Sequence, residues 1–354
     1  MNNDPHSMSS VPSADVRLPA EWEPQSGVLL TWPHDEGDWK GLLPRVEPAL
    51  IAMTVAISQR ERVVLACSDV AHTQALLENT AVLARNVQFL PVPSNDIWAR
   101  DHGPIAVLRE GRPELLDFAF NGWGLKYPAY DDNQISRRLA RLGAFAGTPM
   151  TTLGLVLEGG SIESDGHGAL LTTSRCLLSP NRNPHLTRED LDRELHRLLG
   201  ASRVLWIENG WIEGDDTDAH VDTLVRFCDA HTLAYVSAGD ARGEEADSLR
   251  AMEAQLHAFR TLKGAPYRLA PLPLPEPVCN DEGRRLPATY ANFLIINDAV
   301  LAPIYQCPQD AEALRTLASC FPDREIVPID ATGLVLQFGS VHCASMQFPQ
   351  GVLP

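Results

Sequence analysis

The chain contains a cysteine and a histidine that could supply a nucleophile and an acid–base group. Residues 338–347 place Cys343 shortly after a Gly–Ser turn, and a thiolate is a strong nucleophile once it forms. Residues 213–222 hold five carboxylates and His220, directly before an apolar run. In an extended segment, residues i and i+2 point to the same side, so His220 and Asp222 can face one pocket.

Further carboxylates and indole rings occur in segments that are expected to be loops. One loop contains Asp96, Trp98 and Asp101, Glu158 is followed by two glycines, and Trp123 lies between two glycines. Loops carry function more often than core elements do, and paired glycines permit a tight backbone turn. Taken alone, each segment is also typical of an ordinary turn or a solvated acidic loop.

Together, these side chains have the composition that guanidinium chemistry requires. Two carboxylates can bind the planar fork of N–H groups and keep the cation protonated. A thiolate could then attack the electrophilic central carbon, while a histidine protonates the departing ammonia and later activates water. This chemistry needs no metal and no other cofactor, so none is predicted. We also expect the carboxylates to disfavour the Cys343 thiolate without substrate and to raise the pKa of His220.

Composition and charge limit the classes of partner. The 354-residue chain has 29 Lys and Arg against 46 Asp and Glu, a formal net charge of −17. This balance disfavours nucleic acid and anionic membranes, and it suits a small cationic ligand. The GxGxxG, GxxxxGK[ST], GxSxG and HExxH patterns are absent from the sequence, which removes the usual sequence evidence for dinucleotide, phosphate, serine-hydrolase and zinc-protease sites.

Cysteine usage and the N-terminus bear on location. Seven scattered cysteines without a CxxC pair predict reduced thiols in a cytoplasmic protein. Residues 1–16 have the features of a flexible polar leader rather than a signal peptide. The sequence contains no run of 18 apolar residues, so no membrane span is predicted.

A repeated unit of two strands and a helix runs along the chain. Predicted β-hairpins have their turns near residues 111, 166, 230 and 298, and helical periodicity falls between them. The predicted helices cover residues 43–59, 71–84, 132–146, 188–199, 244–262 and 309–321, and Thr187 with Asp190 predicts a capping box before the fourth. Five units of about 71 residues would fill the chain. We therefore expect one α/β domain over residues 17–354.

Five ordered motifs resemble those of one enzyme family. The segments NDIWARDHGP, FNGWGLKYPAYDDNQ, LEGGSIESDG, DDTDAHVD and VHCASMQ are similar to those of the agmatine deiminase family. It is also described as the Porphyromonas-type peptidylarginine deiminase family, within the guanidine-modifying pentein superfamily. The opening RLPAEWEPQSGVLLTWP resembles the start of the family, so the resemblance covers about residues 17–349.

The resemblance implies a fold and a set of roles. The fold would be a five-bladed α/β propeller of ββαβ repeats with pseudo-fivefold symmetry. Cys343 would be the nucleophile and His220 the general acid and base. Asp101 and Asp222 would bind the guanidinium, and Glu158 would orient His220 or contact the guanidinium. The implied substrate-binding residues are Trp98, Asp216, Asp96 and Trp123.

The substrate remains open between several guanidino compounds. Agmatine, which would give N-carbamoylputrescine and ammonia, is favoured by the acidic residues near His220. Free arginine, another guanidino compound or peptidylarginine are alternatives, and a free amino acid would need a carboxylate-binding arginine. The family has Gly-Gly-Gly-Asn before Ile-His-Cys, whereas this chain has Gln337, Phe338, Gly339 and Ser340 before Val341, a departure that bears on the substrate tail.

Two other classes of function remain beside the deiminase hypothesis. A metal-dependent amidohydrolase would lose activity with a chelator and tolerate thiol alkylation. A polyamine-binding protein without catalysis would have no need of Cys343. The sequence does not determine the oligomeric state, and a homo-oligomer is one of the possibilities.

Overall fold

The computed structural model describes residues 16–354. The leader predicted for residues 1–16 lies outside this range except for Val16. Val16 is buried in strand β1 (Val16–Arg17) and pairs with Arg109, so the predicted leader extends one residue too far. The single domain expected for residues 17–354 stays a prediction. No helix within the described range is long and apolar enough to cross a bilayer.

The strands of the described residues form five sheets, and β1 lies at the edge of one of them, beside Ile105–Arg109. In four sheets an antiparallel pair is followed by a helix and a parallel third strand. They comprise β5 (Ile105–Arg109), β6 (Arg112–Ala119), α5 (Ile135–Arg141) and β7 (Met150–Val156); β8 (Ile162–Ser164), β9 (Ala169–Thr173), α7 (Arg188–Leu199) and β10 (Arg203–Ile207); β11 (Val225–Asp229), β12 (Thr232–Val236), α8 (Glu244–Ala258) and β13 (Arg268–Leu272); and β14 (Leu294–Ile296), β15 (Ala299–Ile304), α9 (Asp310–Cys320) and β16 (Glu325–Asp330).

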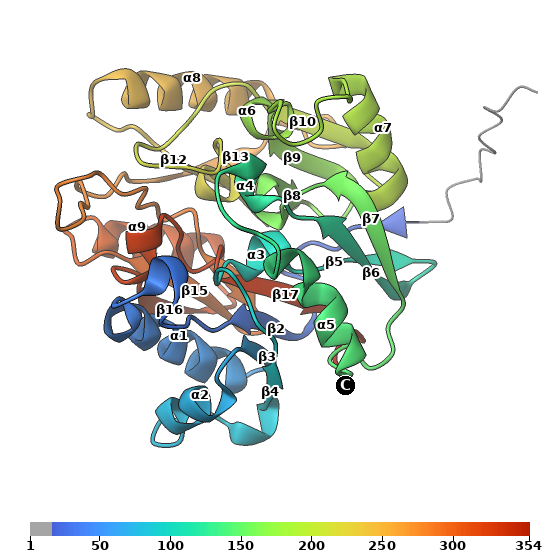
Figure 1. Ribbon diagram of the computed structural model, residues 1–354. Coiled ribbons are helices and arrows are strands. Elements are labelled where there is room, and N and C mark those ends of the chain that lie inside the picture. Colours follow the sequence, from blue (N-terminus) through green and yellow to red (C-terminus); the bar gives the residue numbers. More distant parts are fainter. Residues whose placement is uncertain (1–15) are drawn as a thin grey trace, which may run out of the picture.

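The fifth sheet joins the two ends of the chain. Its order is β17 (Ser345–Pro349), β2 (Gln25–Thr31), β3 (Arg62–Cys67) and β4 (Val87–Pro91), with α1 (Leu43–Ser58) and α2 (Val70–Leu77) in the crossovers. Strand β17 runs antiparallel to β2 and lies beside it in Figure 1. The predicted α/β fold of five ββαβ units is thus confirmed, and the last unit combines C-terminal and N-terminal strands.

Local sequence signals account for most element boundaries. The Thr187–Asp190 capping box is present at the start of α7, and Gly200 ends that helix with a φ of 71°, the left-handed conformation that glycine favours. The strand pairs β5–β6, β8–β9, β11–β12 and β14–β15 flank the predicted hairpin turns near residues 111, 166, 230 and 298. Helix α2 ends at Leu77 and α5 at Arg141, both shorter than predicted, because Asn79 and Gly143 follow shortly afterwards and disfavour helix continuation.

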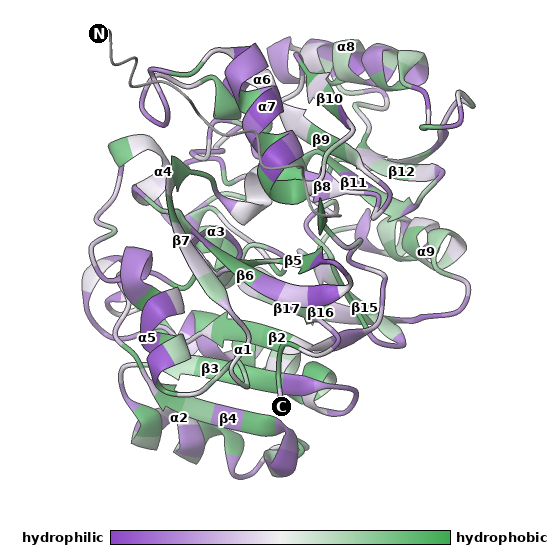
Figure 2. Ribbon diagram, turned by 90° about the vertical axis from the view of Figure 1, so that its right-hand side faces the viewer, coloured by the Kyte–Doolittle hydropathy of each residue, from purple (hydrophilic) through white to green (hydrophobic). Residues whose placement is uncertain are grey.

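The hydrophobic core lies between the sheets and the helices that surround them. Figure 1 shows α1, α2, α5, α7, α8 and α9 on the outside and α3 (Ala99–His102) near the middle. Figure 2 shows β2 and β3 as largely hydrophobic and α7 with one hydrophilic face. Leu29, Leu65 and Val300 on the strands are fully buried. The helices therefore cover the sheets and leave the short segments before the strands facing inward.

Candidate active site

Five segments that lead into the first strand of a sheet converge on one site. Asp101 lies in α3 before β5, Gly160 in the turn η4 (Gly159–Ser161) before β8, and Asp222 in η5 (Val221–Thr223) before β11. Asn292 precedes β14, and Cys343 lies two residues before β17. Each sheet therefore contributes one segment, and residues far apart in the sequence meet because the five sheets surround the site.

Asn292 holds the nucleophile segment in place. Its Oδ1 accepts hydrogen bonds from the backbone N–H groups of His342 and Cys343 at 3.0 and 3.1 Å. Its Nδ2 donates to the Cys343 sulfur at 3.1 Å and to Asp222 Oδ2 at 3.2 Å. One amide side chain thus fixes both the thiol and a neighbouring carboxylate. A donor on the sulfur also favours the thiolate during the reaction.

Asp222 presents one partnered and one open oxygen. Its Oδ2 accepts from His342 Nδ1 at 2.8 Å and lies 3.7 Å from the Cys343 sulfur. Its Oδ1 is buried and has no hydrogen-bond partner among residues 16–354. A buried carboxylate oxygen left open in this way costs free energy unless a ligand donates to it.

Asp101 is held by two donors, one on each carboxylate oxygen. Its Oδ1 accepts from the Gly160 N–H at 3.0 Å, and its Oδ2 accepts from Trp123 Nε1 at 2.9 Å. A Cβ atom on Gly160 would lie 2.6 Å from His220 Nδ1 and 2.8 Å from Asp101 Oδ1. The close approach of carboxylate and histidine therefore requires glycine here.

His220 is fully buried with two open ring nitrogens. Its Nδ1 lies 3.6 Å from Asp101 Oδ1, and neither nitrogen makes a hydrogen bond within the described part of the chain. Glu158 lies close to it, but both carboxylate oxygens of Glu158 accept from Arg182 Nε at 2.9 and 3.0 Å. Glu158 thus contributes its charge to the His220 site while Arg182 fixes its position.

Burial and charge set the protonation states of the two catalytic candidates. Burial raises the pKa of Cys343 well above its ordinary value, and the charges of Asp222 and Asp101 raise it further. Burial opposes protonation of His220, but the charge of Asp101, with Cys176 and Glu158, outweighs it and raises the pKa well above the ordinary value. Both directions agree with those expected from the sequence: the pKa values of the Cys343 thiol and of His220 are both raised.

A narrow cavity leads from the surface to the thiol. The predicted substrate-binding residues all line it, together with aromatic and acidic neighbours. The lining comprises Asp38, Asp96, Trp98, Asp101, Trp123, Tyr127, Asp216, Thr217, Gln337, Phe338, Gly339 and Cys343. Glu158, His220 and Asp222 are not part of this lining and lie deeper, around the sulfur and Asp101. The cavity thus has a carboxylate-rich floor and an aromatic wall.

Two carboxyl groups that line the cavity, those of Asp216 and Asp96, have raised pKa values. Asp216 Oδ2 accepts from the Tyr127 hydroxyl at 2.7 Å, and burial raises the pKa of Asp216 to about 6. Asp96 accepts from Trp39 Nε1 at 2.8 Å, and burial raises its pKa to about 7. A cationic ligand would favour the ionised form of both.

The departure from the family pattern changes the cavity wall at one position. Phe338 lines the cavity with a φ of 68°, and the Arg284 guanidinium lies 4.3 Å from its ring centre. Gly339 lies against Trp98, because a Cβ atom there would be 2.3 Å from the indole ring. Ser340 is buried and bonds to the Tyr305 hydroxyl at 2.9 Å. Phe338 therefore forms part of the cavity wall, whereas Ser340 is buried and lies outside the lining.

Several residues of the site carry no clear signal in the sequence. Asn292 lies outside the five family-like motifs, and Arg182 and Cys176 occur in a helix-to-loop region without a motif. Gly160 and His342 lie inside the family-like motifs, but residue type and spacing do not indicate what they contact. Only the pairing of Gly160 with Glu158 in a Glu-Gly-Gly run offers a sequence cue to a close backbone approach.

Within residues 16–354, two buried clusters have possible metal-ligand atoms within 4.8 Å of one another. Their members are Glu158, Cys176 and His220, and Glu21, Glu163 and His342. Arg182 already bonds Glu158 in the first cluster, and Arg226 bonds both carboxylates of the second. A divalent cation would there be repelled by a buried guanidinium. The donor sets therefore fit arginine better than a metal ion, which favours the thiol chemistry over the metal-dependent alternative.

Comparison with known proteins gives consistent matches over nearly the whole chain. Residues 17–349 match the family described as Porphyromonas-type peptidyl-arginine deiminase. An agmatine deiminase from Pseudomonas aeruginosa is 32% identical, with 96% of this chain and 98% of that protein covered. A cysteine-to-serine variant of the C. jejuni agmatine deiminase with substrate bound is 34% identical, with a TM-score of 0.88 over 95% of this chain and 97% of that one. A Porphyromonas gingivalis structure, named only as a candidate arginine deiminase, is 48% identical, with a TM-score of 0.91 over 96% and 100%.

Proposed function

Because this chain belongs to the Porphyromonas-type peptidyl-arginine deiminase family, we propose that it hydrolyses the guanidinium group of agmatine to N-carbamoylputrescine and ammonia. The observation that carries the proposal is the position of the Cys343 sulfur, 3.7 Å from Asp222 Oδ2 and at the floor of an acidic, aromatic cavity. A thiol in this place can reach the central carbon of a guanidinium that the carboxylates bind.

Substrate binding prepares the nucleophile. The guanidinium donates to Asp101 and to the open Oδ1 of Asp222, and these two carboxylates bind its planar cation. The bound positive charge offsets the two carboxylates that disfavour the Cys343 thiolate, so the thiol loses its proton to solvent more readily in the complex. The Asn292 donor then stabilises the thiolate.

Two half-reactions follow from this arrangement. The thiolate sulfur forms a bond to the guanidinium carbon, and the C–N bond breaks as His220 gives its proton to the leaving ammonia. Neutral His220 then takes a proton from water, whose oxygen adds to the carbon of the thiouronium intermediate. The C–S bond breaks and releases the ureido product. The raised pKa of His220 ensures that its proton is present for the first step.

The cavity supports agmatine as the substrate because of its charge. Agmatine carries an amine at the end opposite its guanidinium, and Asp216 and Asp96 offer carboxylates along the cavity. None of the lining residues in the described chain is Lys or Arg, whereas a free amino acid would need a cationic partner for its carboxylate. The amine therefore has acidic partners and an arginine carboxylate has none in the lining.

A second candidate function is deimination of arginine or peptidylarginine. The Arg284 guanidinium, which lies over the ring of the lining residue Phe338, could bind a carboxylate at the cavity. The 48% identity to a candidate arginine deiminase is also compatible with this alternative. An acid-rich lining disfavours it.

Ammonia release from a panel of guanidino compounds tests the proposal. Agmatine should give the highest kcat/KM, ahead of arginine and an arginine-containing peptide. Cys343→Ala should reduce turnover about a thousandfold or more, with Cys279→Ala as a control because Cys279 is exposed and outside the cavity. A tenth of the parent rate in Cys343→Ala would contradict covalent catalysis, and a preference for arginine would contradict agmatine.

The cellular setting is also part of the proposal. All seven cysteines lie in the described range as free thiols, which supports a reducing compartment such as the cytoplasm. The acidic net charge supports a small cationic guanidino substrate rather than nucleic acid. A homo-oligomer remains a prediction to be checked by light scattering.

A further inference from the structure

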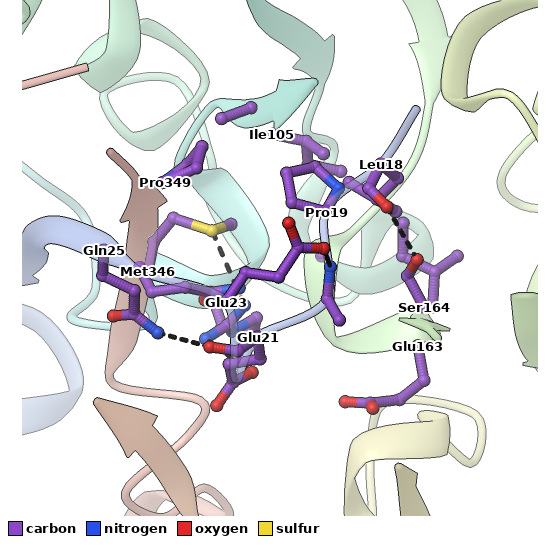
Figure 3. A pocket seen from close by; sticks show the side chains of 16 residues that line it. Leu18, Pro19, Glu21, Glu23, Gln25, Ile105, Glu163, Ser164, Met346 and Pro349 are labelled. Carbon is purple, nitrogen blue, oxygen red and sulfur yellow. Dashed lines mark hydrogen bonds and ion pairs between the residues drawn. The ribbon is translucent and has the colours of Figure 1, made fainter. Parts of the chain in front are cut away.

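A second hollow, here called the rear well, lies behind the active site and shares no lining residue with the catalytic cavity. Figure 3 shows Glu21, Glu23, Gln25 and Glu163 around it, with Met346 and Pro349 of β17 on one side. Its wall includes residues next in sequence to active-site groups, namely Arg100 beside Asp101 and Gly159 beside Gly160. One layer of chain therefore separates the rear well from the catalytic cavity.

A buried hydrogen-bonded row crosses this layer from the rear well to the nucleophile. Glu21 Oε2 lies 2.8 Å from His342 Nε2, and His342 Nδ1 lies 2.8 Å from Asp222 Oδ2. Each of these three residues is less than a tenth exposed. Since both carboxylate oxygens are acceptors, the two contacts are satisfied together when both ring nitrogens of His342 carry a proton.

Glu21 is itself fixed firmly enough to hold the histidine. Its Oε1 accepts from the Ile295 backbone N–H at 2.7 Å, and its Oε2 accepts from Arg226 Nη2 at 2.9 Å. Burial disfavours the ionised form, but Arg226 and His342 outweigh it and lower the pKa of Glu21. Glu21 therefore acts as a fixed, ionised partner for His342.

We propose that Glu21 and His342 are positioning residues for deimination, which hold Oδ2 of Asp222 so that its open Oδ1 faces the guanidinium. The proposal rests on the proposed function of the site and goes beyond the roles expected from the family motifs. Without His342, the Asp222 carboxylate would keep the longer Asn292 bond, at 3.2 Å, and the Cys343 thiol contact, at 3.7 Å. Its side chain could then rotate and present Oδ1 to other partners.

The charged groups around Asp222 indicate how pH reports on this arrangement. Burial tends to raise the pKa of Asp222, but the hydrogen bond and charge of His342, then His220 and Arg226, lower it overall. The acidic neighbours are Asp101, Glu21, Glu163 and the Cys343 thiol, and Arg100 is the remaining cation. Loss of His342 should therefore move the Asp222 titration to higher pH, so guanidinium binding should fail at a higher pH on the acid side.

Equilibrium binding separates this role from turnover. Affinity for agmatine and for guanidinium chloride, which has no tail, is measured against pH by calorimetry in a Cys343→Ala background. Adding Glu21→Gln or His342→Ala should weaken both ligands about tenfold to a hundredfold, as loss of an outer partner of a ligating group commonly does. The pH below which affinity is lost should rise in both variants. His342→Gln, which retains a hydrogen-bond donor, should recover part of the affinity.

Glu23→Gln is the matched control, because Glu23 lines the same well but bonds Arg17 rather than His342. The proposal would be overturned if Glu21→Gln left the pH below which affinity is lost unchanged. It would also be overturned if Glu23→Gln raised that pH by the same amount. Glu21→Gln preserves side-chain shape, so it tests the row even if His342→Ala fails to fold. If guanidinium binding follows the prediction but the parent enzyme releases no ammonia from agmatine, the positioning role stands and the proposed function fails.

Discussion

At the scale of residues, Asp101 and Asp222, the two carboxylates proposed to bind the guanidinium, are held by different kinds of partner. Asp101 accepts from two neutral N–H groups, and burial raises its pKa. Asp222 accepts from His342 and has a lowered pKa, because His342, His220 and Arg226 outweigh its burial. Asp222 is therefore the more firmly ionised of the two before substrate binds, and the bound guanidinium should stabilise the ionised form of Asp101.

Replacing either carboxylate by an amide should impair binding and catalysis. In Asp101→Asn, the amide NH₂ group would face an N–H donor, either that of Gly160 or that of Trp123 Nε1, and one hydrogen bond would be lost. Asp222→Asn would remove the charge that pairs with the guanidinium. Each variant should lose about 2–5 kcal/mol of transition-state stabilisation, measured as kcat/KM on agmatine. Unchanged kcat/KM in both would refute their assignment; Asp117→Asn, on β6, is a control outside the cavity.

The pH dependence follows from a raised thiol pKa and a raised histidine pKa. The active form needs a Cys343 thiolate and a protonated His220, so kcat/KM should rise with pH as the thiol ionises. It should fall only when His220 loses its proton, which its raised pKa moves to more alkaline pH. We expect a bell with its optimum near or above neutrality, measured by ammonia release.

Alkylation by iodoacetamide provides an independent check on the same electrostatics. A non-reactive amidinium bound between the carboxylates should lower the pKa of Cys343 and speed its alkylation, provided that it leaves the sulfur accessible. The rate is measured by mass spectrometry of the peptide that contains Cys343. Slower alkylation at every amidinium concentration would contradict thiol activation by the bound cation, and chelator-sensitive, alkylation-insensitive turnover would favour the metal alternative.

At the scale of elements, the short segments before the strands position the site. Turns such as η4 and η5 present backbone N–H groups and side chains together, while the strands behind them are buried and rigid. Gly160 in η4 is the point of closest approach: a Cβ atom there would also lie 3.1 Å from Asp222 Oδ2. The positions of His220, Asp101 and Asp222 thus depend on the absence of a methyl group at residue 160.

Gly160→Ala should remove activity and lower the free energy of unfolding by about 1–3 kcal/mol. The added Cβ would push His220 and both carboxylates apart, since contacts below about 3.0 Å cannot be tolerated without movement. Gly154→Ala on β7 is the control, because no heavy atom lies within 4 Å of the position that its Cβ atom would take. Thermal unfolding and kcat/KM together decide the outcome: normal activity in Gly160→Ala would show that this approach is not required.

At the scale of the whole molecule, pairing of β17 with β2 links the Cys343 segment to the N-terminal part of the chain. Phe348 in β17 is fully buried, and its ring lies 5.4 Å from that of Phe145. Ser345, two residues after Cys343, pairs with Leu30 of β2. The position of the thiol therefore depends on the completion of the fifth sheet.

Phe348→Ala should test this dependence. Loss of a fully buried phenyl ring should lower the free energy of unfolding by about 3–5 kcal/mol, measured by urea denaturation. Because β17 also anchors Cys343, kcat should fall even under conditions where the variant is folded. Full activity in the folded variant would show that the nucleophile is positioned by its own turn alone; Leu178→Ala, at a partly exposed site, is the control.

The sequence by itself determined the repeated unit, most hairpins and the candidate catalytic side chains. Those features depend on neighbours a few residues apart: alternating apolar residues, the Thr187–Asp190 cap, and compact motifs that carry Asp101, Glu158, His220 and Cys343. Such short-range patterns are visible in a single chain because the physical interactions that they encode are local.

Only the tertiary structure decided which distant groups hold the candidate catalytic side chains in place. Asn292 and Cys343 are 51 positions apart, His342 and Asp222 are 120 apart, and Glu21 and His342 are 321 apart. These hydrogen bonds form because β17 pairs with β2 and five sheets bring their leading segments together. A polar residue such as Glu21 acquires its role from burial against partners that no local pattern specifies, since burial removes water and leaves those partners as its hydrogen-bonding groups.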